Sequence, residues 1–256
     1  MSAPFVIKVG GSTIDRGEAG IEGIAALAKS GERVVVVHGG GPEATRWLEA
    51  MGIPTRFERG RRVTDERVLP VVAAVFAGLV NKRLVAALAE ARVSAVGVSG
   101  VDGGLLPCRI ADPELGFVGE PETPNPAVLE ALLAAGFVPV VAPIGFVRAA
   151  DRTELVNVNA DTVAAALGAA LRATEVNFLT DVEAVRGRRG EPLTALTASE
   201  ARALIAEGVI AGGMIPKVEA CLAAAARGVP ARILHARDAA RLAAGTPPGT
   251  LVLPER

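Results

Sequence analysis

Residues 5–12, with the sequence FVIKVGGS, decide how the rest of this chain can be interpreted. A short apolar run is followed by Gly10 and Gly11, and an alanine-rich amphipathic stretch follows from about residue 19 to residue 29. This pattern indicates a buried strand, a tight turn and a helix. Lys8 lies within the apolar run, where a charge is costly unless the ammonium emerges beside an anion. The segment therefore predicts an α/β fold with a phosphate site at a strand end.

The same alternation continues along the chain, which predicts a mostly parallel central sheet covered on both faces, a three-layer αβα sandwich. A glycine- and proline-rich stretch after residue 98 indicates a small antiparallel insertion. A long helix is expected after Thr64 and Asp65, with a kink or a later start at Pro70. The expected strands are residues 5–9, 33–37, 93–98, 138–142, 175–179 and 231–234, and the other helices are residues 19–29, 43–51, 127–135, 161–171, 199–207 and 215–227.

The bulk composition excludes several classes of protein. The net charge is −1 and arginine and glutamate are intermixed, which argues against a nucleic-acid surface or an anionic-lipid anchor. Two distant cysteines predict neither a disulfide framework nor a zinc site. The apolar stretch 131–147 is interrupted by glycines and prolines, and the N-terminus lacks a secretory signal pattern. We therefore expect a cytoplasmic protein.

Three polar, glycine-rich clusters follow predicted strands, at residues 8–12, 38–42 and 180–187. Ligands of open parallel sheets collect at the carboxyl ends of strands, and glycines let backbone amides approach an anion. Taken singly, each glycine pair could be a tight turn and Lys217 a solvated helix position. The setting of Lys217, GGMIPK, weakens the second interpretation, because it places the lysine at a helix start. NVNAD at 157–161 places further hydrogen-bond donors and acceptors at a strand end. The same segment could also be a turn in which Asp161 caps the next helix.

Neither GxxxxGK[ST] nor GxGxxG is present, which disfavours a P-loop or a dinucleotide site. Eight segments instead resemble the amino acid kinase family, and within it the branch whose acceptor is N-acetyl-L-glutamate. They follow the family's order over nearly the whole chain. The segments are IKVGG (7–11), VHGGGP (37–42), GRRVTD (60–65), GLVNKRLV (78–85), ELGFVGE (114–120), NVNAD (157–161), LTDVEAV (179–185) and GGMIPKV (212–218).

The resemblance implies a role for each matching residue. Lys8 and Lys217 would straddle the transferring phosphoryl group, and Asp161 would hold both lysines in place. Arg62 would grip the α-carboxylate of the acceptor in a bidentate manner. The other implied acceptor contacts are Gly40, Gly41, Asn157 and Asn159, and the implied phosphate and nucleotide contacts are Gly10, Gly11, Thr180, Asp181, Arg186, Val209, Ile210, Ala211 and Met214.

The implied reaction moves the γ-phosphoryl group of ATP to a carboxylate and yields an acyl phosphate. A carboxylate is already ionised at neutral pH, so no general base is required, and catalysis becomes positioning and charge neutralisation. Mg²⁺ is expected to be carried by the ATP phosphates, and no metal site of the protein is expected.

The resemblance also implies one domain over residues 1–256 with two lobes. A lobe of about residues 1–150 would bind the acceptor and dimerise, and a lobe of about residues 151–256 would bind ATP. The expected long helix carries an apolar stripe, which either core packing or a two-fold interface would explain. The stripe consists of Val72, Val75, Phe76 and Leu79. Because only seven residues precede Lys8, we expect a homodimer without the extra N-terminal helix of arginine-inhibited hexamers, and therefore no response to arginine.

Two other functions compete with this one. A sister enzyme phosphorylates an aminoadipate or glutamate attached to a carrier protein, but the intact HGGGP and ELGFVGE favour the free acetylated amino acid. A catalytically inactive amino acid sensor is expected to lose a phosphate-handling residue, whereas Lys8, Asp161 and Lys217 are all present. Three positions depart from the family pattern and bear on acceptor choice: Val68, Pro70 and Val101.

Overall fold

An eight-stranded sheet forms the middle layer of the protein in the computed structural model, which describes residues 2–15, 17, 20–149, 152–245 and 247–255. The strand order is β12-β14-β13-β11-β1-β2-β8-β5, and all neighbouring pairs are parallel except β13 with β14. The strands are β1 (Phe5–Val9), β2 (Val34–His38), β5 (Ala95–Ser99), β8 (Val138–Ala142), β11 (Glu175–Thr180), β12 (Ala195–Thr197), β13 (Ala231–His235) and β14 (Thr250–Leu253).

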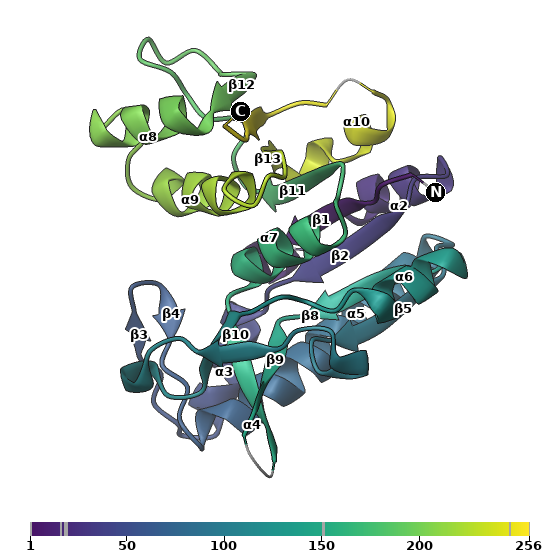
Figure 1. Cartoon of the computed structure of the whole chain (residues 1–256), viewed down its shortest axis with the longest axis vertical. Helices are drawn as coiled ribbons and strands as arrows, with labels where there is room; N and C mark the ends of the chain where they lie inside the picture. The colour runs from purple at the N-terminus through teal and green to yellow at the C-terminus, as the bar shows by residue number, and fades with distance from the viewer. Residues whose placement is uncertain (1, 16, 18–19, 150–151, 246, 256) are drawn as a thin grey trace.

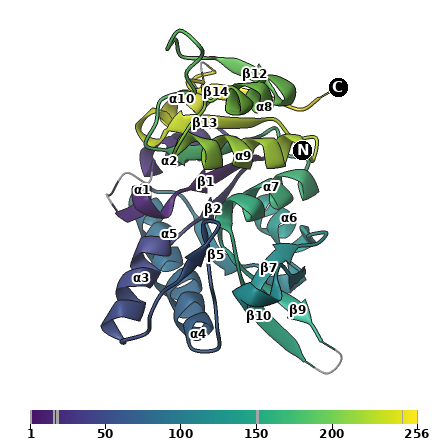
Figure 2. The same ribbon diagram turned by 90° about the vertical axis from the view of Figure 1, so that its left-hand side faces the viewer.

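Helices cover both faces of this sheet (Figure 1). One face packs against α2 (Ile21–Lys29), α5 (Asn81–Glu90) and α10 (Ala240–Ala243), and its core includes Ile7 and Leu179. The other face packs against α6 (Ala127–Ala134), α7 (Ala160–Ala170), α8 (Ala198–Ala206) and α9 (Met214–Ala225). The view in Figure 2 shows the same layers from the side. The predicted αβα sandwich is confirmed.

A second sheet of four strands lies beside the lower part of the central sheet (Figure 2). Its order is β6 (Cys108–Ile110), β7 (Val118–Pro121), β10 (Thr153–Val158) and β9 (Ile144–Arg148). The antiparallel pair of β6 and β7 confirms the predicted insertion. The antiparallel hairpin of β9 and β10 was not predicted, because each strand has three consecutive buried residues and therefore no alternation of apolar and polar positions. This hairpin matters because it ends at Asn157.

The helical segment Val68–Glu90 consists of α4 (Val68–Ala73), a π-helix η1 (Ala74–Val80) and α5. Asp65 Oδ1 accepts the amides of Arg67 and Val68, each at 2.9 Å, so the helix begins after Asp65 and Pro70 falls in the first turn. A missing amide costs little there, which confirms the expected later start. The π-helix was not predicted.

By length and composition alone, Val68–Glu90 is the one helix among the described residues that could cross a membrane. The apolar run that stands out in the sequence is residues 131–147, and this helix was not predicted as a candidate span. Val72, Val75 and Phe76 are buried in a core cluster with α3 (Gly41–Ala50), so core packing explains most of the apolar stripe. The remaining short elements are α1 (Gly11–Asp15), β3 (Phe57–Glu58), β4 (Arg61–Arg62), η2 (Asp102–Gly104), η3 (Pro113–Leu115) and η4 (Ala236–Asp238).

Strand alternation determines which side chains reach the functional end of the sheet. Val6 and Lys8 point to the same face of β1, because side chains two residues apart share a face. Val6 packs in the core under α7, so Lys8 emerges at the carboxyl end of β1 next to the first turn of α7. The carboxyl ends of β1, β2, β8 and β11 lie along one edge, because these strands are parallel.

Candidate active site

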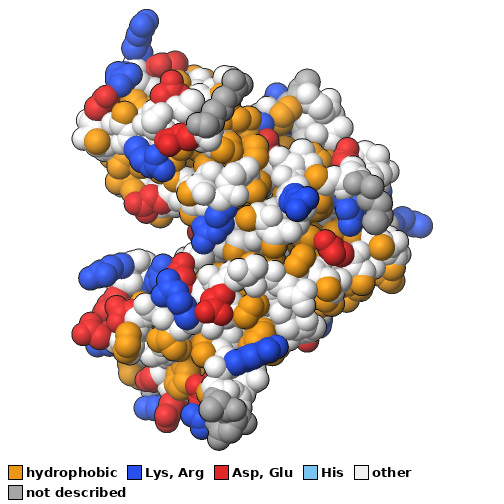
Figure 3. Space-filling model, viewed as in Figure 1, with side chains coloured by type: hydrophobic (Ala, Val, Ile, Leu, Met, Phe, Trp, Pro, Cys, Tyr) orange, Lys and Arg blue, Asp and Glu red, His pale blue; other side chains and the backbone are white. Residues whose placement is uncertain are grey.

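Three cavities follow the carboxyl edge of the central sheet. The lysine cavity, about 170 Å³, contains Lys8, Asp161 and Lys217. The arginine cavity, about 150 Å³, contains Arg62 and Asn157, and the outer cavity, about 560 Å³, is lined by residues between 181 and 237. Figure 3 shows a deep hollow between the part that carries α8 and α9 and the part that carries β3 and β4. The predicted site residues therefore collect on one side of the molecule.

In the lysine cavity, Lys8 is bound by a carboxylate from α7. Its Nζ lies 2.7 Å from Asp161 Oδ1, and the two side chains are 16% and 33% exposed. The N-cap of α7 is Asn159, whose Oδ1 accepts the amides of Asp161 at 2.8 Å and Thr162 at 3.1 Å. The suggested cap by Asp161 is therefore wrong. With Asn159 as the cap, the Asp161 carboxylate is available to Lys8.

Lys217 enters the same cavity from the first turns of α9. Its Nζ lies 3.1 Å from Asp181 Oδ1 and 3.5 Å from the carbonyl of Gly213. The ion pair of Lys217 is thus made with Asp181, at the end of β11, and not with Asp161 as expected for both lysines. Gly10 and Thr180 also line this cavity, as expected for phosphate contacts. Two cations from different elements face one small volume, which suits a multiply charged anion.

Gly11 lies where the two glycine turns touch. A β-carbon on Gly11 would come within 3.0 Å of the amide nitrogen of Gly40 and 3.1 Å of that of Gly41. The absence of a side chain therefore allows these backbone amides to approach one another, and converging amides form a site for an anion. Gly40 and Gly41 line the arginine cavity, and Gly10 lines the lysine cavity.

The arginine cavity holds a buried cation. Arg62 is 5% exposed, and its Nη2 donates to the carbonyl of Gly41 at 2.9 Å and to Thr45 Oγ1 at 2.8 Å. Its guanidinium lies 4.6 Å from the ring centroid of Phe57. Among the described residues, Nη1 has no partner and no carboxylate lies within ion-pair distance of Arg62. Burial lowers the pKa of Arg62, yet an arginine keeps its charge in proteins.

Amide and aromatic side chains complete the arginine cavity. Asn157, at the end of β10, is 8% exposed and donates to Thr64 Oγ1 at 3.1 Å. Asn159 also lines the cavity. Phe57 and Phe76 also line the cavity and were not predicted as site residues, because the sequence around an aromatic residue does not show which cavity it will line. A buried, unpaired arginine with amide neighbours is suited to a small carboxylate.

The outer cavity has apolar walls and a charged rim. Asp181 belongs to both the outer and the lysine cavities, so the two are contiguous. Predicted residues that line it are Asp181, Arg186, Val209, Ile210, Ala211 and Met214, together with residues 182–185 of the predicted cluster 180–187; the lining residues that were not predicted are Pro192, His235 and Arg237. Thr180 lines only the lysine cavity, where its Oγ1 accepts the amide of Val182 at 3.2 Å. The outer cavity has the size and lining that a nucleotide base needs.

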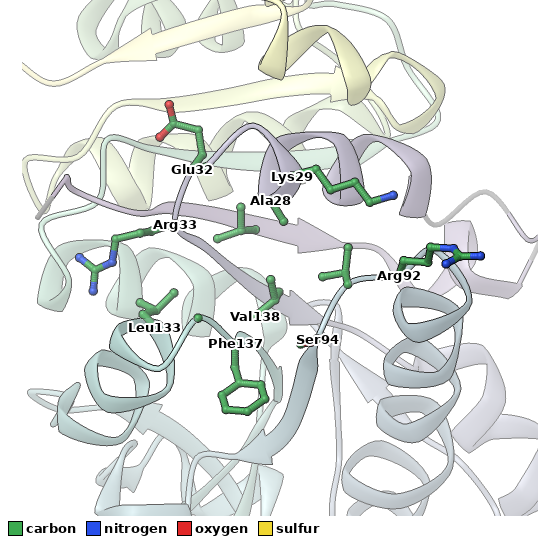
Figure 4. Close-up of a pocket in the computed structure, with 13 residues that line it drawn as sticks. Ala28, Lys29, Glu32, Arg33, Arg92, Ser94, Leu133, Phe137 and Val138 are labelled. Carbon is green, nitrogen blue, oxygen red and sulfur yellow. The ribbon is translucent and has the colours of Figure 1, made fainter.

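A further cavity of about 350 Å³ lies at the opposite edge of the sheet, before the amino ends of β2, β5 and β8 (Figure 4). Lys29, Arg33 and Arg92 border it, but the charged groups of Lys29 and Arg92 point away to one side and that of Arg33 to the other, and Arg33 Nη1 donates to the carbonyl of Ser2. Because no polar groups converge on its centre, this cavity lacks the features of a binding site.

The three departures from the family pattern lie outside the arginine cavity. Val68 is 2% exposed in the core beneath α4, Pro70 lies in the first turn of that helix, and Val101 follows β5. None of these residues lines the cavity. Their expected influence on acceptor choice therefore has no direct contact to support it.

Two lysines between a nucleotide-sized cavity and a cavity with an unpaired arginine define an enzyme of phosphoryl transfer to a small anionic acceptor. The sequence profile of the amino acid kinase family matches residues 3–235. This chain belongs to the amino acid kinase family.

Individual relatives agree with this assignment. The chain is 46% identical over 253 residues to an acetylglutamate kinase of Rubrobacter xylanophilus, covering 98% of this chain and 97% of the relative. It is 41% identical over 235 residues to an acetylglutamate kinase of Dehalococcoides mccartyi, covering 91% and 86%. Among solved structures, smu.665 from Streptococcus mutans superposes with a TM-score of 0.82 at 28% identity, covering all of both chains.

Proposed function

We propose that this protein is an acetylglutamate kinase, which transfers the γ-phosphoryl group of ATP to the γ-carboxylate of N-acetyl-L-glutamate. The product is N-acetyl-glutamyl 5-phosphate, an acyl phosphate of arginine biosynthesis. The observation that carries the proposal is Arg62, a buried cation that faces a small cavity and has no carboxylate partner among the described residues. An acceptor with an α-carboxylate supplies the missing anion. The acetylglutamate kinases that resemble this chain support the same acceptor.

In the proposed mechanism the acceptor's γ-carboxylate is the nucleophile and needs no general base, because it is ionised at neutral pH. Arg62, Asn157 and the turn at Gly40 and Gly41 hold the acceptor with that carboxylate directed at the lysine cavity. Lys8 and Lys217 approach the phosphoryl group from two elements and neutralise the charge that develops on its oxygens. Asp161 and Asp181 fix the two ammoniums before the substrates arrive.

ATP is proposed to bind as its magnesium complex, with its base in the outer cavity and its phosphates in the lysine cavity. Asp161 and Asp181 are each bound to a lysine, and the described residues contain no group of three or more potential metal ligands. This donor set fits an ion carried by phosphate oxygens, as Mg²⁺ commonly is. The metal then enters as part of the substrate.

We also propose that the two lobes share the work, with residues 181–237 binding ATP and the earlier part of the chain binding the acceptor. The arginine cavity also takes Asn157 and Asn159, which come after residue 150. β10 pairs with β9 and β7 and belongs with the acceptor side. We therefore place the division between β10 and α7, a few residues later than the sequence alone suggested.

A cytoplasmic homodimer is proposed as the working form. The apolar stripe of the long helix no longer supports it, since Val72, Val75 and Phe76 are buried within one chain. The support comes from β5, an apolar edge strand whose residues 95–98 are only half-buried, and from the helix Val68–Glu90, whose most apolar window is 39% buried. An edge strand with half-buried apolar residues offers a surface to a second copy, although Lys82 Nζ donates to the Gly97 carbonyl of this strand at 3.1 Å. Light scattering tests this; a mass of one 26.1 kDa chain at micromolar concentration contradicts it.

A coupled assay of ATP turnover with three acceptors tests the proposed function. Acetylglutamate should be the preferred acceptor, because a free α-ammonium would be forced against a cation already present in the arginine cavity. Free glutamate and free aminoadipate should react much more slowly. Equal turnover of glutamate contradicts the need for the acetyl group. Turnover only of a carrier-linked amino acid assigns the chain to the sister enzyme, and binding without turnover identifies a sensor.

A further inference from the structure

His38 ends strand β2 and has no role in the proposed chemistry, although it directly precedes the glycine turn of residues 39–41. The side chain is 0% exposed, and the strand that carries it is otherwise apolar and pairs with β1 and β8. Burial, together with the charge of Lys82, lowers the pKa of His38 to about 4, against the hydrogen bond to Gly39, which raises it. The ring is therefore neutral at pH 7, with one protonated nitrogen.

The surrounding groups fix which ring nitrogen carries that proton. Nδ1 lies 2.8 Å from the carbonyl oxygen of Gly39, which can only accept, so the proton is on Nδ1. Nε2 lies 3.2 Å from Asn81 Nδ2 and accepts from it. The orientation of the Asn81 amide is set in turn, because its Oδ1 accepts from Lys82 Nζ at 3.0 Å and its Nδ2 also donates to the Val140 carbonyl at 2.8 Å.

Other contacts hold the glycine turn of residues 39–41, but at atoms other than the Gly39 carbonyl: the Gly40 carbonyl accepts the Ala44 amide at 3.0 Å, and the Gly41 carbonyl accepts from Thr45 and Arg62. Residues 39–41 have no side chains, so packing cannot fix the turn from within, and glycine has the largest backbone freedom to lose. The amide of Gly39 donates to the Val9 carbonyl at 2.9 Å. The Phe76 ring lies below Gly40, where a β-carbon would come within 2.7 Å of it. The hydrogen bond from His38 restrains the Gly39 carbonyl, which none of these contacts reaches.

The π-helix explains how one segment contacts both His38 and the turn. Phe76 and Asn81 are five residues apart, and i→i+5 hydrogen bonding brings residues at that spacing to the same side of the helix. In a regular α-helix they would point in clearly different directions. The π-helix η1 thus places the Phe76 ring beneath Gly40 while the Asn81 amide meets the His38 ring.

We propose that His38 is a positioning residue, whose Nδ1–H holds the Gly39 carbonyl and thereby fixes the amides of Gly40 and Gly41 for acceptor binding and phosphoryl transfer. Asn81 keeps the ring in this tautomer. The kinetic part of this inference rests on the proposed kinase function, whereas the tautomer does not depend on it.

The tautomer is tested by nitrogen-15 NMR of the full chain, which contains only two histidines. The signal that disappears in His38→Asn belongs to His38. At pH 7 we expect it to show a protonated Nδ1 and an unprotonated Nε2. A protonated Nε2 overturns the proposal. This result is independent of the acceptor, so a failure of the proposed function cannot be mistaken for a failure of this inference.

Two substitutions separate positioning from simple packing. In His38→Asn, the side-chain amide nitrogen can take the position of Nδ1 and donate to the Gly39 carbonyl. In His38→Gln, the longer side chain places its amide at the position of Nε2, so no donor remains near the Gly39 carbonyl. His38→Gln should lower kcat roughly tenfold to hundredfold, because misplaced binding groups cost about that much. The KM for the acceptor should rise and the KM for ATP should not, and His38→Asn should recover most of kcat.

The thermal stabilities of both variants provide the control. If the activity of both variants falls in proportion to their melting temperatures, or if the KM for ATP rises with that for the acceptor, His38 acts through packing alone and the proposal is wrong. If His38→Gln is too unstable to assay, the NMR measurement of the wild-type tautomer tests the proposal in its place.

Discussion

The lysine cavity and the arginine cavity both present cations to an anionic ligand, but they balance those cations differently. Lys8 and Lys217 each have a carboxylate of their own, at 2.7 and 3.1 Å, and all four side chains are partly exposed. Arg62 is almost fully buried, contacts only a carbonyl, a hydroxyl and an aromatic ring among the described residues, and leaves Nη1 without a partner.

The difference fits two distinct tasks. In the proposed mechanism a phosphoryl group passes through the lysine cavity, so its cations need fixed positions both before and after transfer, and protein carboxylates provide them. The arginine cavity has to select the acceptor. A buried cation that has no carboxylate partner in the protein favours a ligand that carries an anionic group. In this mechanism the cations of the lysine cavity mainly raise the rate of phosphoryl transfer, and the cation of the arginine cavity mainly decides which acceptor binds.

The largest effect is expected in the lysine cavity. Lys8→Ala and Lys217→Ala should each lower kcat by about two to three orders of magnitude, the typical cost of removing one group that stabilises a transition state. The KM values should change much less, because each ammonium contributes most while charge develops. Steady-state kinetics with both substrates measure this.

Lys8→Arg is the matched control, because it keeps the charge. It should also be harmful, since a planar guanidinium cannot replace a point charge in a small glycine-lined cavity. Kinetics in which either alanine variant raises only KM would show that these lysines bind substrate without assisting transfer.

The second effect concerns His38, a buried base behind the turn that borders the arginine cavity. Its pKa is lowered from 6.5 to about 4, mainly by burial, so the unfolded chain binds a proton more readily than the native protein between these values. Stability should therefore fall as the pH falls from 6.5 to 4, with this group costing about 3 kcal/mol in total. Urea unfolding at several pH values measures the slope.

Carboxylates also titrate in this range, so the comparison with His38→Asn isolates the histidine. The variant should show a shallower loss of stability than the wild type between pH 6.5 and 4. Parallel pH profiles for the two proteins would mean that His38 keeps a near-normal pKa.

The third effect separates the two cavities directly. Arg62→Lys should raise the KM for the acceptor roughly tenfold to hundredfold, because a lysine cannot form paired hydrogen bonds to a carboxylate and leaves polar groups unpaired. The KM for ATP should stay nearly constant. Arg56→Lys is a matched control, since Arg56 is exposed and pairs with Glu58. An equal loss of affinity for both substrates would mean that the cavities are not independent.

The sequence predicted the positions of the candidate site residues well where polar residues follow strand ends. Lys8, Thr180 and Asp181 are placed by apolar runs whose ends can be read directly, and NVNAD is polar where a strand has to stop. The choice of ion-pair partner could not be predicted, because the carboxylate nearest to Lys217 is decided by how α9 packs against β11. Likewise, both Asn159 and Asp161 are good helix caps, and only the backbone geometry selects Asn159.

Features that depend on tertiary packing were missed or misjudged. The π-helix depends on contacts around Phe76 and Asn81 that a local pattern does not contain. The stripe with Val72 and Val75 was ambiguous between core and interface, and the structure buries it within one chain. The hairpin that includes Asn157 was missed because its strands do not alternate, since each has three consecutive buried residues. Periodicity identifies which residues are apolar, but the surface they cover is decided by the rest of the fold.

The smallest effect tests whether an unpaired polar group always indicates function. Asn177 in β11 is 0% exposed, and neither its Nδ2 nor its Oδ1 has a partner within the described part of the chain. Unlike Arg62, it lines none of the cavities described above and is flanked by Ile7 and Arg232 on the neighbouring strands.

Asn177→Val should therefore raise the free energy of unfolding by about 1 kcal/mol, by removing a buried unpaired amide and adding a residue that favours strands. Urea unfolding measures this gain, and kcat should be unchanged. Asn177→Ala serves as the opposite control, because removing most of the side chain leaves a cavity and should destabilise the sheet. If Asn177→Val instead lowers stability or activity, the amide has a bound partner, and an unpaired polar atom then marks a ligand or water site here as it does at Arg62.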